Sequence, residues 1–375
     1  MRRFISVFIA LTLIGVGVLL MYKYSRSFKF KGVQESEIEF NNSFIFEEKA
    51  CLNFIEREMV SEGGGIYTNF LDSDNVQPYA SGHEVLSESE GLIMIYYVKN
   101  NKKEKFDLHY EYVNKNMLLD SGLIRWRIRE GNKDLSKSSA AIDDLRIARA
   151  LIYAYNLWGD RKYLSTLKKI NKGLIRYSVK DDYLTDYYEE NFSYTSDQIT
   201  LSYMDLFTIK QLSVLDKEWN KIYEKGLEVI RNGFISNSLP LYQKTYKISE
   251  GKYIKEDYIN IIDSMLVVMH LSEVGLARRE SIEWIRNQIY DREGIYSKYS
   301  IETGEPLDTQ ESTAVYAIAA RIAKNIGDKS LHCELIEKML ALQVKDKGSR
   351  LYGSFGDIRT LKVYSFDNLQ ALLAF

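Results

Sequence analysis

The feature that most constrains the fold is an alternation between two kinds of predicted helix. One kind is apolar nearly all round, and a helix that is hydrophobic on every side must be buried on every side. These segments are residues 92–98, 145–154, 261–271 and 314–323. The segments between them are amphipathic, with apolar residues at helical spacing on one face. One such set is Leu164, Leu167, Ile170 and Leu174, and another is Leu331, Leu335, Met339 and Leu340.

This alternation predicts an all-α fold in which an inner ring of buried helices is wrapped by an outer ring. About twelve helix candidates follow residue 45, and helical hairpins of this kind would close into an (α/α)6 barrel. An irregular helical domain or a superhelix of helix pairs fits the same periodicity. Because no Pro- or Ser-rich linker interrupts residues 45–375, we expect this region to be one domain.

The N-terminal end carries an uncharged run of nineteen residues, 4–22. As a helix it would nearly cross a hydrocarbon layer of ~30 Å. No small-x-small cleavage site ends the run, so we expect an uncleaved signal anchor, with a transmembrane helix within residues 1–26 and a tether over residues 27–44. More basic residues follow the run than precede it, which argues against the usual orientation with the N-terminus inside.

Composition narrows the classes of function. The net charge is −2, so no strongly basic surface and no nucleic-acid partner are predicted. Two cysteines and four scattered histidines fit neither a disulfide framework nor a common metal-binding motif. The 28 tyrosines and 4 tryptophans supply flat amphipathic side chains suited to sugar rings, although core packing is their commoner role.

Acidic residues stand at the beginnings of the apolar segments. They are Glu88, Asp143, Asp144, Asp263 and Glu311. The inner helices of such a barrel run parallel, so their N-termini meet at one end and would gather these carboxylates. Clustered carboxylates in unlike surroundings allow a general acid and a general base to coexist at one pH. The alternative is that each acid only caps its helix and complements the helix dipole.

The order of several short motifs resembles glycoside hydrolase family 8. Residues 87–91 (Ser-Glu-Ser-Glu-Gly) are similar to the family's Ser-Glu-Gly-x-Gly segment, and residues 140–148 to its aspartate-rich helix start. Further likeness lies in residues 122–127, 201–205 and 258–264. Residues 82–88 and 364–369 resemble a divergent Gram-positive branch that is often found with exopolysaccharide genes. The family fold is the same (α/α)6 barrel.

The resemblance implies a role for each matching residue. Glu88 takes the position of the general acid that protonates the leaving oxygen. Asp263 takes the position of the base that activates a water. Asp144 matches the aspartate that contacts the sugar at the cleavage subsite, and Trp126 and Tyr203 would line the groove.

The sequence departs from the family pattern at Ile142. The family carries an aspartate there, two residues before the one matched by Asp144. Asp143 stands beside it and would compensate as a substrate-binding residue, although a shift of one residue turns a side chain by ~100° around a helix. Ile142 therefore leaves open a different substrate or a lost activity.

The resemblance implies an inverting hydrolase of a β-linked polysaccharide that needs no metal or organic cofactor. Such a substrate lies outside the cell or emerges from a membrane synthase. We therefore expect an external domain held at the cell membrane by its anchor. There it would process or release exopolysaccharide beside such a synthase.

Two other functions remain open. A polysaccharide lyase on a similar barrel would need a Tyr/His or Arg pair, and His83 is the only histidine near a candidate motif. A non-catalytic glycan-binding subunit of an exopolysaccharide secretion complex is favoured by Ile142. Product formation separates the enzymes from the binding subunit, and an unsaturated product marks the lyase.

Overall fold

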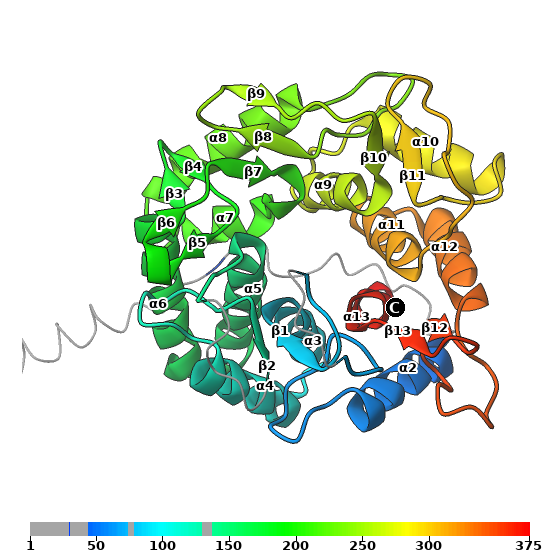
Figure 1. Cartoon of the computed structure of the whole chain (residues 1–375), viewed down its shortest axis with the longest axis horizontal. Coiled ribbons are helices and arrows are strands. Elements are labelled where there is room, and N and C mark those ends of the chain that lie inside the picture. The colour runs from blue at the N-terminus through cyan, green and yellow to red at the C-terminus, as the bar shows by residue number, and fades with distance from the viewer. Residues whose placement is uncertain (1–29, 31–43, 74–78, 130–136) are drawn as a thin grey trace, which may run out of the picture.

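The protein folds into two concentric rings of helices. The structure, a computed structural model, describes residue 30 and residues 44–73, 79–129 and 137–375. The inner helices are α3 (Ser87–Lys99), α5 (Ala141–Trp158), α7 (Leu206–Leu212), α9 (Ile261–Glu273), α11 (Thr313–Asn325) and α13 (Ser365–Ala374). Each packs against the next, and α13 packs against α3, so the inner ring is closed (Figure 1).

The outer ring consists of the alternate helices. They are α2 (Ile45–Glu58), α4 (Lys103–Asn116), α6 (Arg161–Tyr177), α8 (Glu218–Asn232), α10 (Arg279–Tyr290) and α12 (Lys329–Ala341). With the inner helices they make twelve helices in the described part of the chain. The predicted (α/α)6 arrangement, with the inner and outer sets alternating along the sequence, is therefore what the described residues form (Figure 1).

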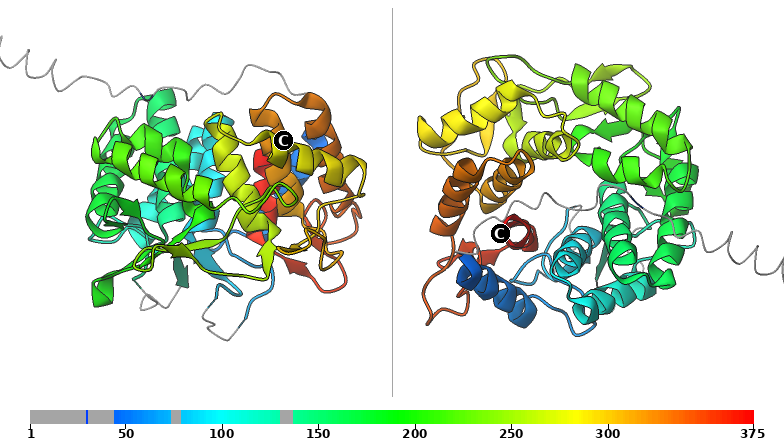
Figure 2. Two further views of the ribbon diagram at one scale, coloured as in Figure 1. Left: turned by 90° about the horizontal axis from the view of Figure 1, so that it is seen from above. Right: turned by 180° about the vertical axis from the view of Figure 1, so that it is seen from behind.

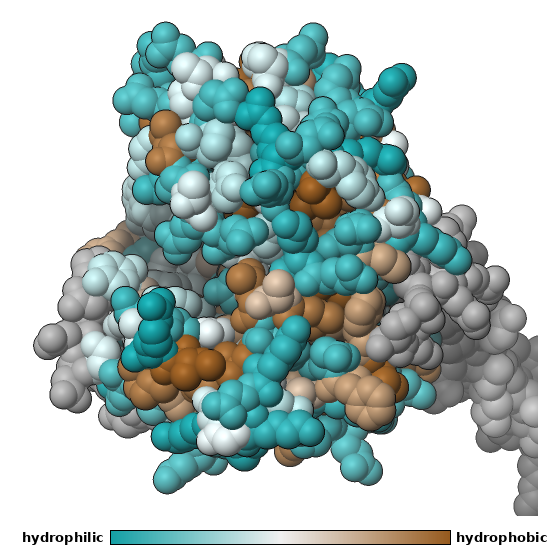
Figure 3. Space-filling view, turned by 90° about the vertical axis from the view of Figure 1, so that its right-hand side faces the viewer, coloured by the Kyte–Doolittle hydropathy of each residue, from teal (hydrophilic) through white to brown (hydrophobic). Residues whose placement is uncertain are grey.

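Burial explains why the two sets of helices separate. After its first turn α9 buries nearly every side chain, as does α3, because both have apolar residues on all faces. In α6 the buried residues form a stripe that includes Tyr163, Leu167, Ile170 and Leu174, and the opposite face is charged. The wall that carries α10, α12 and α2 is accordingly mostly hydrophilic, with hydrophobic residues in smaller patches (Figure 3).

Short antiparallel strands, which the sequence analysis did not predict, gather at one end of the barrel (Figure 2, left). They include β1 (Glu84–Leu86), β2 (Arg127–Arg129), β7 (Gln198–Thr200), β8 (Thr245–Lys247), β10 (Tyr258–Asn260) and β11 (Lys298–Ser300). The others are β3 (Val179–Lys180), β4 (Tyr183–Leu184), β5 (Tyr188–Glu189), β6 (Tyr194–Thr195), β9 (Lys252–Tyr253), β12 (Gly356–Asp357) and β13 (Lys362–Val363). We call this end, where the inner helices begin, the front end. The end where the inner helices finish is the rear end.

The N-terminal expectations lie largely outside the described residues. The expected transmembrane helix within residues 1–26 is not described, and of the tether over residues 27–44 only Phe30 and Phe44 are. Within the described ranges no helix is long and apolar enough to span a membrane. Phe30 is buried, lies edge-to-face against Tyr155 at a ring separation of 6.5 Å, and accepts a hydrogen bond from Asn156 at 3.2 Å. Both partners are in the last turns of α5, so Phe30 is fixed to the rear end of the barrel.

Candidate active site

Glu88 lies in the first turn of α3, where β1 brings the chain to the front end. The backbone N–H of Ser87 donates to the carbonyl of Trp126 at 2.9 Å, which fixes the start of α3 to the segment before β2. The Glu88 side chain is 27% exposed and lies 3.2 Å from Arg146. Burial raises the pKa of Glu88 to about 7, with Arg146 opposing and Asp143 adding to the rise. A glutamic acid with this pKa keeps its proton near neutral pH, as a general acid must.

Arg146 joins Glu88 to Asp143. Its Nη1 lies 3.2 Å from Glu88 Oε2 and 2.7 Å from Asp143 Oδ1. The Ser87 hydroxyl donates to the other oxygen of Asp143 at 2.8 Å. Burial raises the pKa of Asp143, while the Arg146 charge and the Ser87 hydrogen bond lower it. The structure therefore brings Asp143 into one cluster with the predicted acid.

Asp144 points away from this cluster. Its Oδ1 accepts a hydrogen bond from the backbone N–H of Ile124 at 2.7 Å, and its side chain is fully buried. Burial raises the pKa of this carboxyl well above its usual range. Asp144 thus ties α5 to the turn that precedes Arg125. The geometry does not support the expected sugar contact, and Asp143 is the aspartate of the pair that faces Glu88.

Ile142, where the family pattern has an aspartate, is 3% exposed in the first turn of α5. We expect Ile142→Asp to lower the free energy of unfolding by about 1–3 kcal/mol, because a carboxylate would be buried beside two others without a partner. The substitution should not raise turnover per folded molecule. Denaturant unfolding beside the apolar control Ile142→Val checks the first point, and a glycan-hydrolysis assay checks the second. A gain in turnover at unchanged stability would contradict this prediction.

Asp263 lies in the first turn of α9. The pairing of β10 with β11 and the cap from Asn260 to the N–H of Ile262, at 3.0 Å, set where this helix begins. The Ser202 hydroxyl donates to one carboxylate oxygen at 3.3 Å, and the Lys244 ammonium lies 3.2 Å from the other. Because Asp263 raises the pKa of Lys244, the two form a charge pair. A carboxylate held by a cation and 26% exposed is placed as a general base should be.

Tyr203 and Asp186 lie between these two groups. Tyr203 ends the short helix η3 (Leu201–Tyr203), and burial and then the charges of Asp143 and Asp186 raise its pKa. Both oxygens of Asp186 accept hydrogen bonds from Thr200, from the N–H at 2.5 Å and from the hydroxyl at 2.8 Å. Burial raises the pKa of Asp186 to about 6. The cluster therefore runs from Glu88 past Tyr203 to Asp263.

Trp126 lies beside the acid, and its half-buried indole stacks against the Arg127 guanidinium at 4.5 Å. His83, the histidine considered for a lyase, stacks instead on Tyr67 at 4.0 Å and has Nε2 3.2 Å from the carbonyl of Phe70. The structure therefore gives His83 a packing role outside the cluster.

Sequence reasoning missed several members of the cluster. They are Arg146, Asp186, Ser202, Lys244 and Asp367. Arg146 could have been found, because an arginine three residues after Asp143 on a helix lies on the same face. Asp186 and Lys244 could not, since they stand beside short strands whose pairing with distant segments brings them to the site, and no local pattern encodes that pairing.

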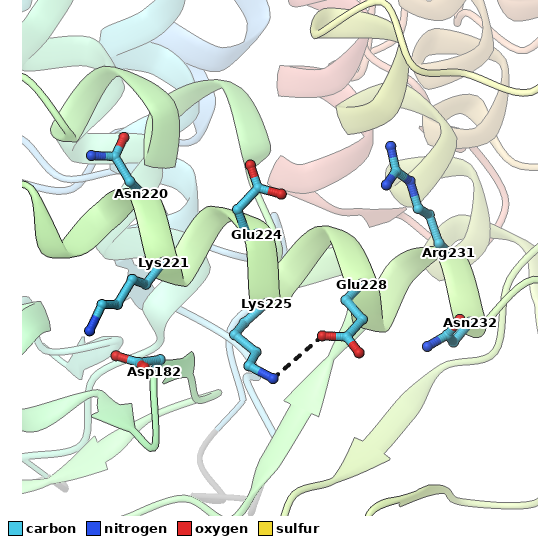
Figure 4. Close-up of a pocket in the computed structure, with 8 residues that line it drawn as sticks. All are labelled: Asp182, Asn220, Lys221, Glu224, Lys225, Glu228, Arg231 and Asn232. Carbon is cyan, nitrogen blue, oxygen red and sulfur yellow. Dashed lines mark hydrogen bonds and ion pairs between the residues drawn. The ribbon is translucent and has the colours of Figure 1, made fainter.

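Other polar features of the described residues lie elsewhere. A hollow on the outer wall is lined by side chains of α8 and by Asp182, and two of its charged residues, Lys225 and Glu228, pair at 3.4 Å (Figure 4). The trio Asp205, His270 and Glu273 has metal-ligand spacing. Arg149 donates to both carboxylates of that trio, so their oxygens already have a cationic partner.

A barrel of this kind with an acid of raised pKa and a second, lysine-paired carboxylate at one open end is typical of glycosidases. Comparison with known proteins agrees. Residues 57–186 match the model of the glycosyl hydrolases of family 8. A solved structure described as a novel alpha-amylase from Clostridium perfringens is 41% identical, with a TM-score of 0.83 over 88% of this chain and 96% of that one.

Two further relatives cover most of the chain. The Bacillus subtilis protein YdaJ is 29% identical over 330 residues, which cover 86% of this chain and 84% of YdaJ. The endoglucanase Cel10 of Klebsiella pneumoniae, a family 8 glycosyl hydrolase, shares the fold at 18% identity, with a TM-score of 0.63 over 86% of this chain and 97% of that one. The chain therefore belongs to the family-8-like glycosyl hydrolases. It is a glycosidase.

Proposed function

We propose that the protein is an inverting hydrolase in which Glu88 is the general acid and Asp263 the general base. The observation that carries this proposal is the contrast between the two carboxyls, one with a pKa raised to about 7 and the other paired with a lysine. Glu88 gives its proton to the glycosidic oxygen as the bond from that oxygen to the anomeric carbon breaks. Asp263 takes a proton from a water whose oxygen attacks the same carbon from the opposite face, which inverts its configuration.

The neighbours of each group suit its role. Arg146 orients the Glu88 carboxyl and limits the rise of its pKa, so that the proton is available near pH 7. The Lys244 ammonium pairs with Asp263 at 3.2 Å, and the carboxylate stays partly exposed. Tyr203 interacts electrostatically with Glu88, Asp143 and Asp186, and we expect it to contact the reacting sugar.

The linkage of the substrate has two candidates. The family resemblance favours a β-linked polysaccharide. The relative from Clostridium perfringens, at 41% identity, is described as an alpha-amylase, whereas the endoglucanase Cel10 is 18% identical. We therefore propose an α-linked glucan as the first candidate and a β-linked glucan as the second.

One experiment tests the chemistry and the linkage together. The full-length chain in detergent micelles is incubated with amylose, pullulan, mixed-linkage β-glucan, xylan and chitosan, and new reducing ends are counted. Proton NMR then records the anomer that is released first. We expect cleavage of amylose with β-anomer release, since an inverted α-linkage gives the β-product. Release of the α-anomer from amylose would contradict inversion, and cleavage of β-glucan alone would select the second candidate.

A hairpin of aromatic residues beside the cluster favours a long substrate. The hairpin of β5 and β6 is joined to the segment before α5 by the Ser139 N–H, which donates to the carbonyl of Tyr188 at 2.9 Å. It exposes Phe192 by 81% and Tyr194 by 49%, and the ring of Tyr194 lies 6.0 Å from that of Tyr187. Exposed rings next to a glycosidase centre can stack on the sugars that follow the cleaved linkage.

We expect Phe192→Ala to raise the KM for a polymer by about threefold to tenfold, because an exposed stacking surface is lost. The kcat on a short chromogenic oligosaccharide should stay unchanged. Phe46→Ala is the matched control, since Phe46 is 79% exposed on the outer helix α2. Steady-state kinetics on both substrates measures the effect. Equal changes in the two variants would show that the hairpin does not bind the polymer.

The cellular role is a further part of the proposal. The uncharged run of residues 4–22 and the polysaccharide substrate together favour an external domain anchored in the cell membrane. There it would process or release an exopolysaccharide, with a membrane synthase as partner. Protease added to intact cells should remove the barrel from a full-length chain tagged at its C-terminus. A barrel protected until the membrane is permeabilised would contradict the external location.

A further inference from the structure

The rear end of the barrel exposes aliphatic side chains where four inner helices finish. They are Leu157 in the last turn of α5, Val214 after α7, Leu276 after α9 and Ile326 after α11, with exposed fractions of 51%, 39%, 38% and 38%. The backbone fixes these positions, because the N–H of Leu276 donates to the carbonyl of Leu271 and that of Ile326 to Ile322. The front end also exposes aromatic residues, as in the hairpin of β5 and β6. Flat rings suit sugars, and branched aliphatic chains suit lipid.

Basic residues surround these aliphatic side chains in a regular way. An exposed basic residue stands at the N-cap or first position of the outer helices α4, α6, α8, α10 and α12. They are Lys102, Arg161, Lys217, Arg279 and Lys329. Cations at helix N-termini oppose the helix dipole, so this placement does not serve helix stability. The repetition at one end of the barrel points instead to an anionic partner.

Acidic residues are present at the rear end, but several are already engaged. Asp328 lies 2.5 Å from Arg286 and accepts from the N–H of Leu331 at 3.1 Å. Asp160 accepts from the N–H of Lys162 at 3.0 Å. Exposed acids remain in the first turns of the outer helices, at Glu104, Glu218 and Glu280. The acids next to Arg161 and Lys329 are therefore already engaged, whereas Lys102, Lys217 and Arg279 each stand within two residues of an exposed acid.

The length of chain before Phe30 favours a lipid bilayer as the anionic partner of the rear end. Phe30 is packed against Tyr155 at the rear end, and seven residues separate it from the end of the uncharged run at Tyr22. An extended link of this length spans at most about 28 Å. An anchor formed by residues 4–22, which belongs to the proposed function, therefore keeps the rear end close to the bilayer.

We propose that the rear end docks on an anionic lipid bilayer, with Leu157, Val214, Leu276 and Ile326 at the interface and the five basic residues against the headgroups. This inference rests on the proposed anchor. It turns the front end away from the membrane, so that Glu88 and Asp263 face the space into which a polysaccharide extends.

The test uses full-length chains that carry one introduced cysteine in a Cys333→Ser background. Cys51 is fully buried, and burial raises the pKa of its thiol, so it does not label. A polarity-sensitive fluorophore is attached at Leu276→Cys or Ile326→Cys on the rear end, and at Phe192→Cys or Leu307→Cys on the front end. The proteins are reconstituted into vesicles of phosphatidylcholine alone or with phosphatidylglycerol, each with and without doxyl-labelled lipid.

We expect the rear labels to be quenched at least threefold more strongly than the front labels in phosphatidylglycerol vesicles. A quadruple variant that reverses four of the basic charges should remove that difference. Its substitutions are Arg161→Glu, Lys217→Glu, Arg279→Glu and Lys329→Glu. The same variant should keep or raise the melting temperature, since acids at helix N-termini complement the helix dipole. Equal quenching at both ends, stronger quenching at the front, or no effect of charge reversal would overturn the proposal.

Two controls keep this result separate from the proposed function. Resistance to carbonate extraction reports on the anchor, whatever the labels show. Hydrolysis of a soluble oligosaccharide in the same samples reports on catalysis. An active, anchored protein whose rear labels are not quenched would reject the docking surface alone.

Discussion

Glu88→Gln is expected to lower kcat by roughly 10²–10⁴-fold, the contribution of a general acid. The amide has the shape of the carboxyl but no proton to give to the leaving oxygen. Substrate binding should change little, because the amide would still fill the space beside Arg146. A kcat within threefold of the wild type on a glucan that the wild type cleaves would assign the acid to another residue.

The same variant should be more stable than the wild type in alkaline solution. Burial raises the pKa of Glu88 from 4.5 to about 7, so the folded state binds the proton more tightly than the unfolded state. This contribution to stability is fully present below pH 4.5 and is lost as the pH rises through 7. The amide of the variant cannot ionise, and the melting temperature of the variant should therefore exceed that of the wild type at pH 8 but not at pH 4.

Glu90→Gln is the matched control on the same helix. Glu90 is fully buried, accepts from the N–H of Ile66 at 2.8 Å and lies 2.8 Å from His109. The amide changes the hydrogen bonding of this buried group to Ile66 and His109, so the melting temperature should fall while kcat per folded molecule is retained. Glu88→Gln should therefore lose activity and gain stability at pH 8, whereas Glu90→Gln should lose stability and keep its activity.

A pH profile provides a third measurement. The kcat/KM of the wild type should fall as the pH rises past about 7, where Glu88 loses its proton. An alkaline limb above pH 9 would contradict the raised pKa. Arg146→Gln should shift this loss of activity to higher pH, since the Arg146 charge lowers the pKa of Glu88.

The ring of helices could be predicted because its cause is local. The residues of a segment such as 261–271 are enough to show that it is apolar on all faces. Burial on all sides follows from that. The short strands could not be predicted, because β1 and β2 are three residues each and exist only as partners across 40 residues of chain. Their pairing nevertheless sets where α3 begins, and so where Glu88 points.

The aspartate pair at the start of α5 illustrates the same limit. The motif aligns Asp144 with the sugar-binding residue, but the structure turns Asp143 toward Glu88 and Asp144 toward Ile124. Adjacent helical residues differ by ~100° in direction, so the register of the first turn decides which one reaches the site. That register is fixed by the N–H of Ala141, which donates to the carbonyl of Asp186 at 2.8 Å. The contact joins residues 45 positions apart, and no local pattern shows it.

Asp263→Asn is expected to lower kcat by roughly 10²–10⁴-fold as well, because the attacking water loses its base. The two oxygens of Asp263 are held by Ser202 and Lys244 at 3.3 and 3.2 Å, and 26% of the side chain is exposed, so a water can reach it. Asp263→Ala should recover part of the lost rate in azide, since the anion can occupy the vacated space and attack the anomeric carbon. Glu88 would still supply the proton to the leaving oxygen.

Asp186→Asn is the comparison that makes this assignment decisive. Asp186 is the other carboxyl on this side of the cluster, but Thr200 occupies both of its oxygens, at 2.5 and 2.8 Å. Its carbonyl also accepts the N–H of Ala141, so it positions the segments that carry Asp143 and Tyr203. We therefore expect a loss of about tenfold, without azide rescue. If Asp186→Ala were rescued by azide and Asp263→Ala were not, Asp186 would be the base, and Asp263 would be the residue that positions Lys244.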